Sequence, residues 1–172
     1  MPDPDSPEPD SSEPGPPVPG PTRRGPIIAL GFDFGRRRIG LAVGTTLTGS
    51  AAPLRAVAML AGGPDWDAIG REIRAHQPHM LVVGVPYNAD GTAGPMAAAT
   101  RGFARGLGAR FGLPVGEVDE RWSSLEAQDR LREERASGQR RRRVQKQDID
   151  SAAAAIILTR WLAAEEGSKQ GE

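Results

Sequence analysis

Two strongly apolar runs near the start of the chain are joined by only four residues, and this short connection limits how they can pair. The runs cover residues 27–34 and 39–45, and the sequence GRRR lies between them. A third run, residues 51–59, follows the turn-rich sequence TLTGS. Short apolar runs with short connections favour an antiparallel meander of three strands.

Beyond the meander, the apolar pattern alternates between helix and strand. Trp66, Ile69 and Ile73 lie at helical spacing, and Pro78 ends that pattern. Three strands followed by strand–helix alternation predict an α/β fold: a mixed β-sheet of a three-strand antiparallel meander plus two further strands, flanked by helices. The further elements are a strand over 79–85, a loop over 86–94, a helix over 95–112, a strand over 113–120, and helices over 123–135 and 148–166.

Residues 1–26 differ in composition from the rest of the chain. They hold 10 of the 16 prolines and five acidic residues, with almost no aliphatic side chains. Such a segment cannot bury enough apolar surface to offset its ordering entropy. We therefore predict a disordered arm over 1–26, a single domain over 27–166 and a disordered tail over 167–172.

Charge and cysteine content exclude several classes of protein. Without residues 1–26 the chain carries 20 basic and 17 acidic residues, so the domain is mildly basic. There is no cysteine, which rules out thiol catalysis and fits a reducing cytoplasm. The arm lacks the features of a signal peptide, and no apolar stretch reaches the roughly 18 residues of a membrane span. We predict a cytoplasmic protein with no membrane partner.

An aspartate interrupts the first apolar run. Side chains alternate along a strand, so Asp33 faces away from Phe32 and Phe34, between two glycines. Burying an ionised carboxylate without a partner costs folding free energy of several kcal/mol, so a cation is expected beside Asp33. The alternative is that Asp33 is a turn residue.

Two further acids can converge with Asp33. Glu120 ends the last predicted strand, next to Asp119. Asp150 begins an apolar helical stripe that also contains Ala154, Ile157 and Trp161. The simpler explanations are an ion pair between Glu120 and Arg121, and a helix-dipole role for Asp150, with Asp148 as the N-cap of that helix. Whether Asp119 or Asp148 joins the acidic cluster stays open.

Three carboxylates without histidine or cysteine indicate a site for hard cations. Oxygen ligands select Mg²⁺ or Mn²⁺ over zinc or copper. Two such ions about 3.5–4 Å apart can activate water and stabilise the leaving oxygen of a phosphodiester. We predict that Asp33, Glu120 and Asp150 are the metal-binding and catalytic residues of a metal-dependent phosphodiesterase with a two-metal site.

A basic run lies directly before the last helix. Such a run is commonly a solvated loop, but beside an acidic metal site it can hold phosphates. The predicted phosphate-binding residues here are Arg140, Arg141, Arg142, Arg143 and Lys146.

Four motifs, in this order, resemble the YqgF/RuvX proteins, a family of pre-16S rRNA nucleases with an RNase H-like fold. They are FDFGRRRIGLAVG (32–44), VVGVPYNADGT (82–92), VDERWSSLEA (118–127) and IDSAAAAIIL (149–158). The motifs span nearly the whole chain outside the arm. The resemblance implies an RNase H-like mixed sheet and a metal-dependent endonuclease.

The resemblance also implies a site and a substrate. Asp33, Glu120 and Asp150 fall where such a nuclease carries its acidic site. The family's activity is linked to trimming the 5′ end of pre-16S rRNA, so structured RNA and ribosomal precursor particles are the expected partners. The resemblance further implies contact with nucleic acid or support of the site by Arg38, Gly40, Asn88, Gly91 and Arg121.

Other functions stay open at this point. RuvC-type Holliday-junction or R-loop resolvases share the fold, and a resolvase needs a dimer with two sites, so both a monomer and a homodimer are possible. The sequence DFGRRRIG also resembles the phosphate loop of the actin and sugar-kinase fold, which needs two domains where this chain has room for one. A non-catalytic RNA-binding ribosome assembly factor is the remaining alternative, against which the three acids argue.

Overall fold

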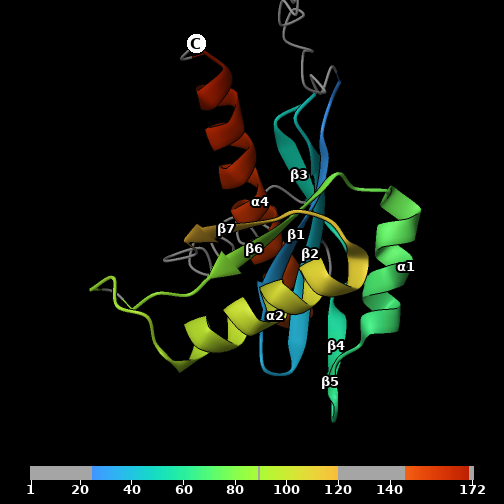
Figure 1. Cartoon of the computed structure of the whole chain (residues 1–172), viewed down its shortest axis with the longest axis vertical. Coiled ribbons are helices and arrows are strands. Elements are labelled where there is room, and N and C mark those ends of the chain that lie inside the picture. Colours follow the sequence, from blue (N-terminus) through green and yellow to red (C-terminus); the bar gives the residue numbers. More distant parts are fainter. Residues whose placement is uncertain (1–24, 89, 120–145, 171–172) are drawn as a thin grey trace, which may run out of the picture.

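The computed structural model describes residues 25–88, 90–119 and 146–170 of the chain. These residues form one seven-stranded sheet with helices on both faces (Figure 1). The elements, in chain order, are β1 (Ile28–Phe34), β2 (Arg38–Thr45), β3 (Ser50–Pro53), β4 (Val57–Leu60), β5 (Gly63–Pro64), α1 (Trp66–His76), β6 (Met80–Val85), α2 (Pro95–Phe111), β7 (Val115–Asp119) and α4 (Lys146–Gln170).

The central strand β1 joins the antiparallel and parallel halves of the sheet. The strand order is β5-β4-β2-β1-β6-β7, and β3 also pairs with β2. β1 pairs antiparallel with β2, and it pairs parallel with β6, which in turn pairs parallel with β7. The mixed sheet predicted from the sequence is therefore confirmed, because the short 35–37 connection closes a hairpin while the helical connections run between parallel strands.

The third predicted strand, residues 51–59, is two strands. β3 pairs with one end of β2, and β4 pairs with the other end. Between them Leu54 still donates its N–H to the carbonyl oxygen of Leu41 at 2.8 Å. β3 ends at Pro53, which has no N–H for a ladder, and β4 then forms a small hairpin with β5. The apolar pattern predicted one continuous strand here, but the pairing with β2 is broken after Pro53 and resumes at β4.

Each face of the sheet packs against different helices. α1 and α2 cover one face, and α4 covers the other (Figure 1). Leu30 and Phe32 of β1 lie in the core under α1 and α2, where Phe32 contacts Phe103 edge to face at 5.8 Å. Ala29 lies in the core under α4. The alternation predicted for β1 is thus confirmed on both faces.

α4 lies close to the sheet because glycines line the strands beneath it. A Cβ at Gly31 would come within 2.8 Å of Leu158 Cβ, and one at Gly44 within 2.9 Å of Leu162 Cδ1. Ala154 and Ile157, both fully buried, belong to the same contact. The apolar stripe predicted for this helix is confirmed, and it is the stripe that packs on the sheet.

The helix boundaries follow local signals in part. α1 begins after Asp65, whose Oδ1 accepts the N–H of Ala68 at 3.1 Å, and it ends at Gln77 in the left-handed conformation. α4 begins at Lys146, so Asp148 lies within its first turn and is not the N-cap. α4 also continues to Gln170, past residue 166, where the sequence placed the end of the domain. Within the described ranges, no helix has both the length and the apolarity to cross a bilayer.

Candidate active site

Asp33 lies near the carboxyl end of β1 on the face that α4 covers. Its register partners are Gly40 of β2 and Gly84 of β6. Neither neighbouring strand therefore places a side chain over the half-buried carboxylate. Phe34, the next residue, turns to the opposite face and stacks on Phe103 at 4.9 Å. The strand thus presents the Asp33 carboxylate near the end of an otherwise apolar surface.

Gly40 brings Asp150 next to Asp33. A Cβ at Gly40 would overlap the carbonyl group of Asp150 and would lie 2.9 Å from the backbone nitrogen of Ser151. The first turns of α4 therefore rest directly on β2 at the position opposite Asp33. Since Cα atoms of paired antiparallel residues are about 4.5–5.5 Å apart, the two aspartates share one end of the α4 face.

Arg38 supplies a cation to this acidic pair. Its Nε lies 3.2 Å from Oδ2 of Asp150, and the two side chains are 32% and 24% exposed. Arg38 is the first residue of β2, two positions before Gly40, so its guanidinium reaches the same end of α4. Arg36 and Arg37 precede it in the hairpin and are exposed. This arginine pairs with Asp150, and the cation predicted beside Asp33 stays a prediction.

The remaining predicted site residues are not all described. Two of the three predicted acids come together, and within the ranges that the structure covers no group of three or more possible metal ligands occurs. Lys146 begins α4, but its side chain is not described. The predicted residues that lie outside the described part of the chain are Glu120, Arg121, Arg140, Arg141, Arg142 and Arg143.

Asn88 has a structural partner in the loop between β6 and α2. Its Nδ2 donates to Oγ1 of Thr92 at 2.9 Å, and its backbone N–H donates to the carbonyl oxygen of Thr92 at 2.9 Å. Thr92 Oγ1 donates in turn to Asp90 Oδ1 at 2.7 Å. Gly91 has a φ of 87°, which glycine tolerates without strain. Asn88 therefore shapes this loop, and its contact with nucleic acid stays a prediction.

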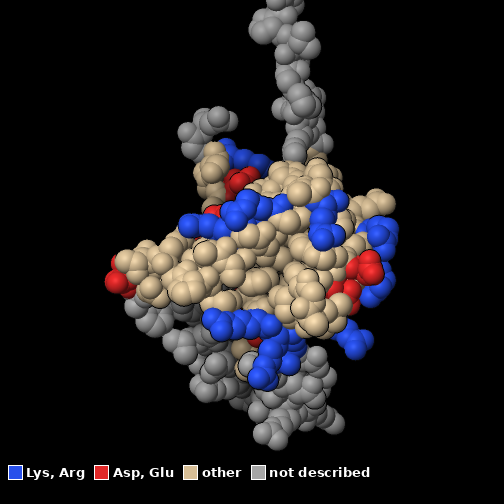
Figure 2. Space-filling view, turned by 60° about the horizontal axis from the view of Figure 1, so that its bottom comes forward, with Lys and Arg blue, Asp and Glu red and all other residues tan. Residues whose placement is uncertain are grey.

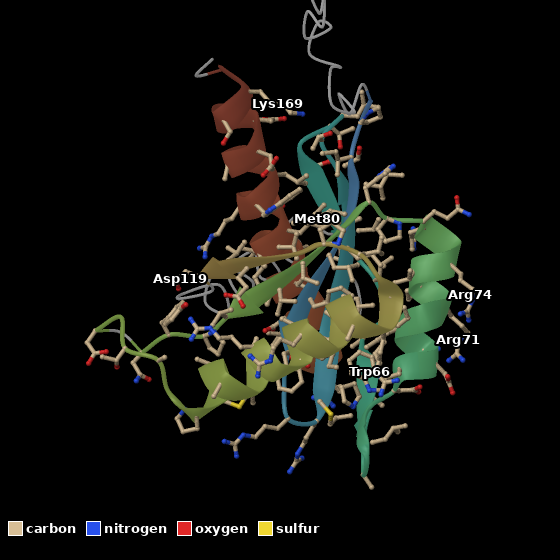
Figure 3. The ribbon with its side chains drawn as sticks, viewed as in Figure 1. Trp66, Arg71, Arg74, Met80, Asp119 and Lys169 are labelled. Atoms are coloured by element: carbon tan, nitrogen blue, oxygen red, sulfur yellow. The ribbon has the colours of Figure 1, made fainter. Side chains whose placement is uncertain are left out.

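Asp119 is the last residue of β7 and lies at the same end of the strands as Asp33. It pairs with Val85, one step beyond the level of Asp33, because Asp33, Gly84 and Val118 are in register across three strands. Figure 3 shows Asp119 at the tip of β7. Its carbonyl oxygen accepts a hydrogen bond from Arg160 Nη1 of α4 at 3.5 Å, so this contact ties the strand end to the helix.

A second group of charged residues was missed by the sequence reasoning. Arg101 of α2 donates from Nη2 to the hydroxyl of Tyr87 at 2.7 Å, and its Nε lies 3.8 Å from Oε2 of Glu117. The available signal was the composition of α2, which carries three arginines and no acidic residue. In Figure 2, Lys and Arg side chains form one band across the upper part of the face shown and a second group near its lower edge, with the acidic side chains mostly toward the margins.

Comparison with known proteins identifies the family. A family model for RuvX, described as Holliday junction resolvase, matches residues 27–164. A "Putative pre-16S rRNA nuclease" of Xanthomonas oryzae pv. oryzae (strain PXO99A) is 47% identical over 135 residues, which are 78% of this chain and 86% of that protein. A protein of the same name from Coxiella burnetii (strain Dugway 5J108-111) is 46% identical over 136 residues, 79% of this chain and 92% of that one.

The fold has a solved counterpart. The structure of T. thermophilus RuvC in complex with Holliday junction substrate aligns with a TM-score of 0.50 at 19% identity, covering 82% of this chain and 96% of that one. At this identity the likeness concerns the fold alone. The structural alignment thus shows that the chain has the RNase H-like fold of RuvC, and the family model over residues 27–164 with the relatives at 46–47% identity shows that it belongs to the RuvX family.

Proposed function

We propose that this protein is a divalent-metal-dependent endonuclease that hydrolyses phosphodiester bonds in structured RNA, with the 5′ end of pre-16S rRNA as its substrate. The observation that carries the proposal is the pairing of Asp33 and Asp150 at one end of the α4 face, which Gly40 makes possible. The names of the relatives from Xanthomonas oryzae and Coxiella burnetii support this choice of substrate.

The residues at this end of the sheet fit a hard divalent cation. Carboxylate oxygens are the ligands that Mg²⁺ and Mn²⁺ prefer, and the ion pair of Asp150 with Arg38 supports the proposal that this carboxylate is ionised and can hold a cation. Asp33 and Asp150 would hold the metal, with Glu120 as the third proposed ligand. When bound, one or two such ions supply charge stabilisation and an activated water for phosphodiester hydrolysis.

The arginines of the β1–β2 hairpin have a separate role in this proposal. Arg36 and Arg37 are exposed in the hairpin that leads from Asp33 to Arg38, and the Nε of Arg36 lies 3.4 Å from Met96 Sδ of α2. Guanidinium groups match phosphate geometry. They hold the backbone of the substrate against the site. Arg38 neutralises Asp150, and its guanidinium would be available to a phosphate if Asp150 held a metal ion instead.

Replacing Arg38 by Gln is expected to tighten the binding of Mg²⁺. The variant loses a cation that competes for Asp150, so the melting temperature should rise more steeply with added Mg²⁺ than in the wild type. Without metal, the loss of this partly exposed ion pair should cost no more than about 1 kcal/mol of unfolding free energy. Differential scanning fluorimetry measures both effects.

Arg37→Gln is the matched control, because Arg37 is the neighbouring exposed arginine and takes part in no ion pair among the described residues. It should respond to Mg²⁺ like the wild type. Weaker Mg²⁺ binding by Arg38→Gln than by Arg37→Gln would show that Arg38 supports the metal rather than competing with it.

A second candidate is cleavage of four-way DNA junctions, which the description of the matching family favours. The two functions are separated by incubating the full chain with a precursor 16S rRNA 5′ segment and with a four-way junction, each with Mg²⁺ and with Mn²⁺. We expect cleavage of the RNA, and none by the Asp33→Asn variant. Cleavage of the junction alone, with a dimer mass in solution, would favour the resolvase. Binding without cleavage of either substrate would favour a non-catalytic assembly factor.

A further inference from the structure

The outer edge of the sheet carries a groove that the proposed nuclease site does not use. It lies between α2 and β7 and has a volume of about 370 Å³, which is within the range of sites for small ligands. Its walls come from one stripe of α2, the turn that follows, and two side chains of β7. The lining residues are Arg101, Ala104, Arg105, Gly108, Leu113, Val115 and Glu117.

One cation of the groove is fixed in place. The guanidinium of Arg101 donates to the Tyr87 hydroxyl at 2.7 Å, lies 5.7 Å from the centre of the Tyr87 ring, and has Glu117 Oε2 3.8 Å from its Nε. It is nevertheless 41% exposed, so part of its donor edge is available to a ligand. A cation held in this way loses little side-chain entropy when a ligand binds.

The second cation of the groove is available for a ligand. Arg105 is exposed, one helical turn from Arg101, and it takes part in no ion pair among the described residues. No acidic residue occurs in Pro95–Phe111, so nothing on α2 itself offsets the two charges. The floor between them is apolar, formed by Ala104 and Val115.

We propose that this groove binds a nucleotide in a single-stranded flank of the RNA substrate. Arg101 and Arg105 contact the phosphate, and the base lies against the apolar floor, where a guanidinium plane can also stack on it. Glu117, which only accepts hydrogen bonds, receives them from the amino group of a base. The inference rests on the proposed nuclease function and deepens it by placing part of the substrate.

The spacing across the sheet allows one substrate to reach both places. Asp33, Gly84 and Val118 are in register on three adjacent strands, and Glu117 directly precedes Val118. The lateral offset of two strand spacings is about 10 Å, and the path around the end of the sheet adds to it, so the bound nucleotide lies more than about three nucleotides from the cleaved bond. The groove lies on the α2 face and the acids on the α4 face, so the RNA must pass around the edge of the sheet at which β6 and β7 end.

A protein strand is the competing occupant. Within the described residues β7 pairs only with β6, and an edge strand can accept a peptide as an additional strand. Strand addition uses backbone groups, and it gives no reason for two arginines above an apolar floor. The paired cations favour a polyanion, and hence the nucleic acid.

The test compares Arg105→Gln with Arg71→Gln in the full chain. Arg71 is an exposed arginine on α1, and Figure 3 shows it on the opposite side of the molecule from Asp119 and the end of β7. The two variants therefore lose the same charge at different places. Binding of a fluorescein-labelled single-stranded 12-nucleotide RNA is followed by anisotropy in EDTA, where no cleavage occurs, over a series of salt concentrations.

We expect Arg105→Gln to weaken binding several-fold and to lower the salt slope by about 0.7, as for one lost phosphate contact on a single strand. Arg71→Gln should match the wild type in both. In NMR spectra of the wild type, the amides of Gly108 and Val115 should shift when the RNA is added.

Two results would overturn the groove proposal. One is equal RNA binding by Arg105→Gln and Arg71→Gln, which would favour a peptide strand paired with β7 as the ligand of this edge. The other is an RNA titration in which Gly108 and Val115 do not shift. If in either case the wild type still cleaves RNA and Asp33→Asn does not, the proposed function stands without the groove. If the wild type neither binds nor cleaves RNA, both proposals are wrong.

Discussion

Replacing Asp33 by Asn is expected to slow metal-dependent cleavage by at least about 1,000-fold, which corresponds to about 4 kcal/mol of transition-state stabilisation. The amide keeps the shape of the carboxylate but removes its charge at the position between Gly40 and Gly84. RNA binding should be retained, because the arginines rather than the acids attract the phosphates. Single-turnover cleavage and anisotropy measure the two quantities on the same preparation.

The same variant should lose most of its stabilisation by metal. A ligand at 100 times its Kd stabilises the folded state by about 2.7 kcal/mol, so Mg²⁺ should raise the melting temperature of the wild type and raise that of Asp33→Asn much less. Without metal, the variant should be as stable as the wild type or up to about 1 kcal/mol more stable, since it removes repulsion between acids. Arg38 already offsets part of that repulsion through Asp150.

Asp67→Asn is the matched control for this experiment. Asp67 is an exposed acid in the first turn of α1, on the face of the sheet away from α4. It should cleave and respond to Mg²⁺ like the wild type. Cleavage by Asp33→Asn at the wild-type rate, in metal-scrubbed buffer with Mg²⁺ restored, would show that the acidic pair described here is not the catalytic site.

The parts of this site that follow a short-range period could be predicted from the sequence. Alternation along β1 placed Asp33 opposite the face of Phe32, and the helical stripe placed Asp150 at the end of α4 that packs on the sheet. Both patterns depend only on the repeat of a strand or a helix. Residues 51–59 form two strands rather than one because β3 and β4 pair with opposite ends of β2. This depends on the partner strand, so the local pattern of residues 51–59 did not predict it.

Contacts between distant segments could not be predicted in the same way. The ion pair of Arg38 with Asp150 joins residues 112 positions apart, and nothing in either local sequence specifies it. Asn88 was predicted to contact nucleic acid, but its bonds to Thr92 depend on how the 86–94 loop closes. The groove between α2 and β7 likewise needs the packing of a helix on an edge strand before Arg101 and Glu117 come together.

Replacing Gly40 by Ala is expected to lower both the stability of the fold and the activity of the site, because it adds a methyl group where β2 contacts α4. A Cβ there would overlap the backbone of Asp150 and lie 2.9 Å from the nitrogen of Ser151, and these nearest atoms are all backbone atoms rather than the ends of flexible side chains. Overpacking of a core costs about 1–3 kcal/mol, and the rigid backbone on both sides puts Gly40→Ala at the upper end of that range. For a domain of this size, 3 kcal/mol corresponds to a fall in melting temperature of about 6–12 °C.

Gly102→Ala is the control, because a Cβ at Gly102 would meet only Nη2 of Arg105, at 3.8 Å. In the middle of α2 this change should stabilise the protein by about 0.5–1 kcal/mol. Since Gly40→Ala pushes the start of α4 away from β2, the remaining folded protein should also lose its Mg²⁺-dependent rise in melting temperature and its cleavage of RNA. A Gly40→Ala variant with wild-type stability and wild-type Mg²⁺ response would mean that the contact of Gly40 with Asp150 does not position the acids.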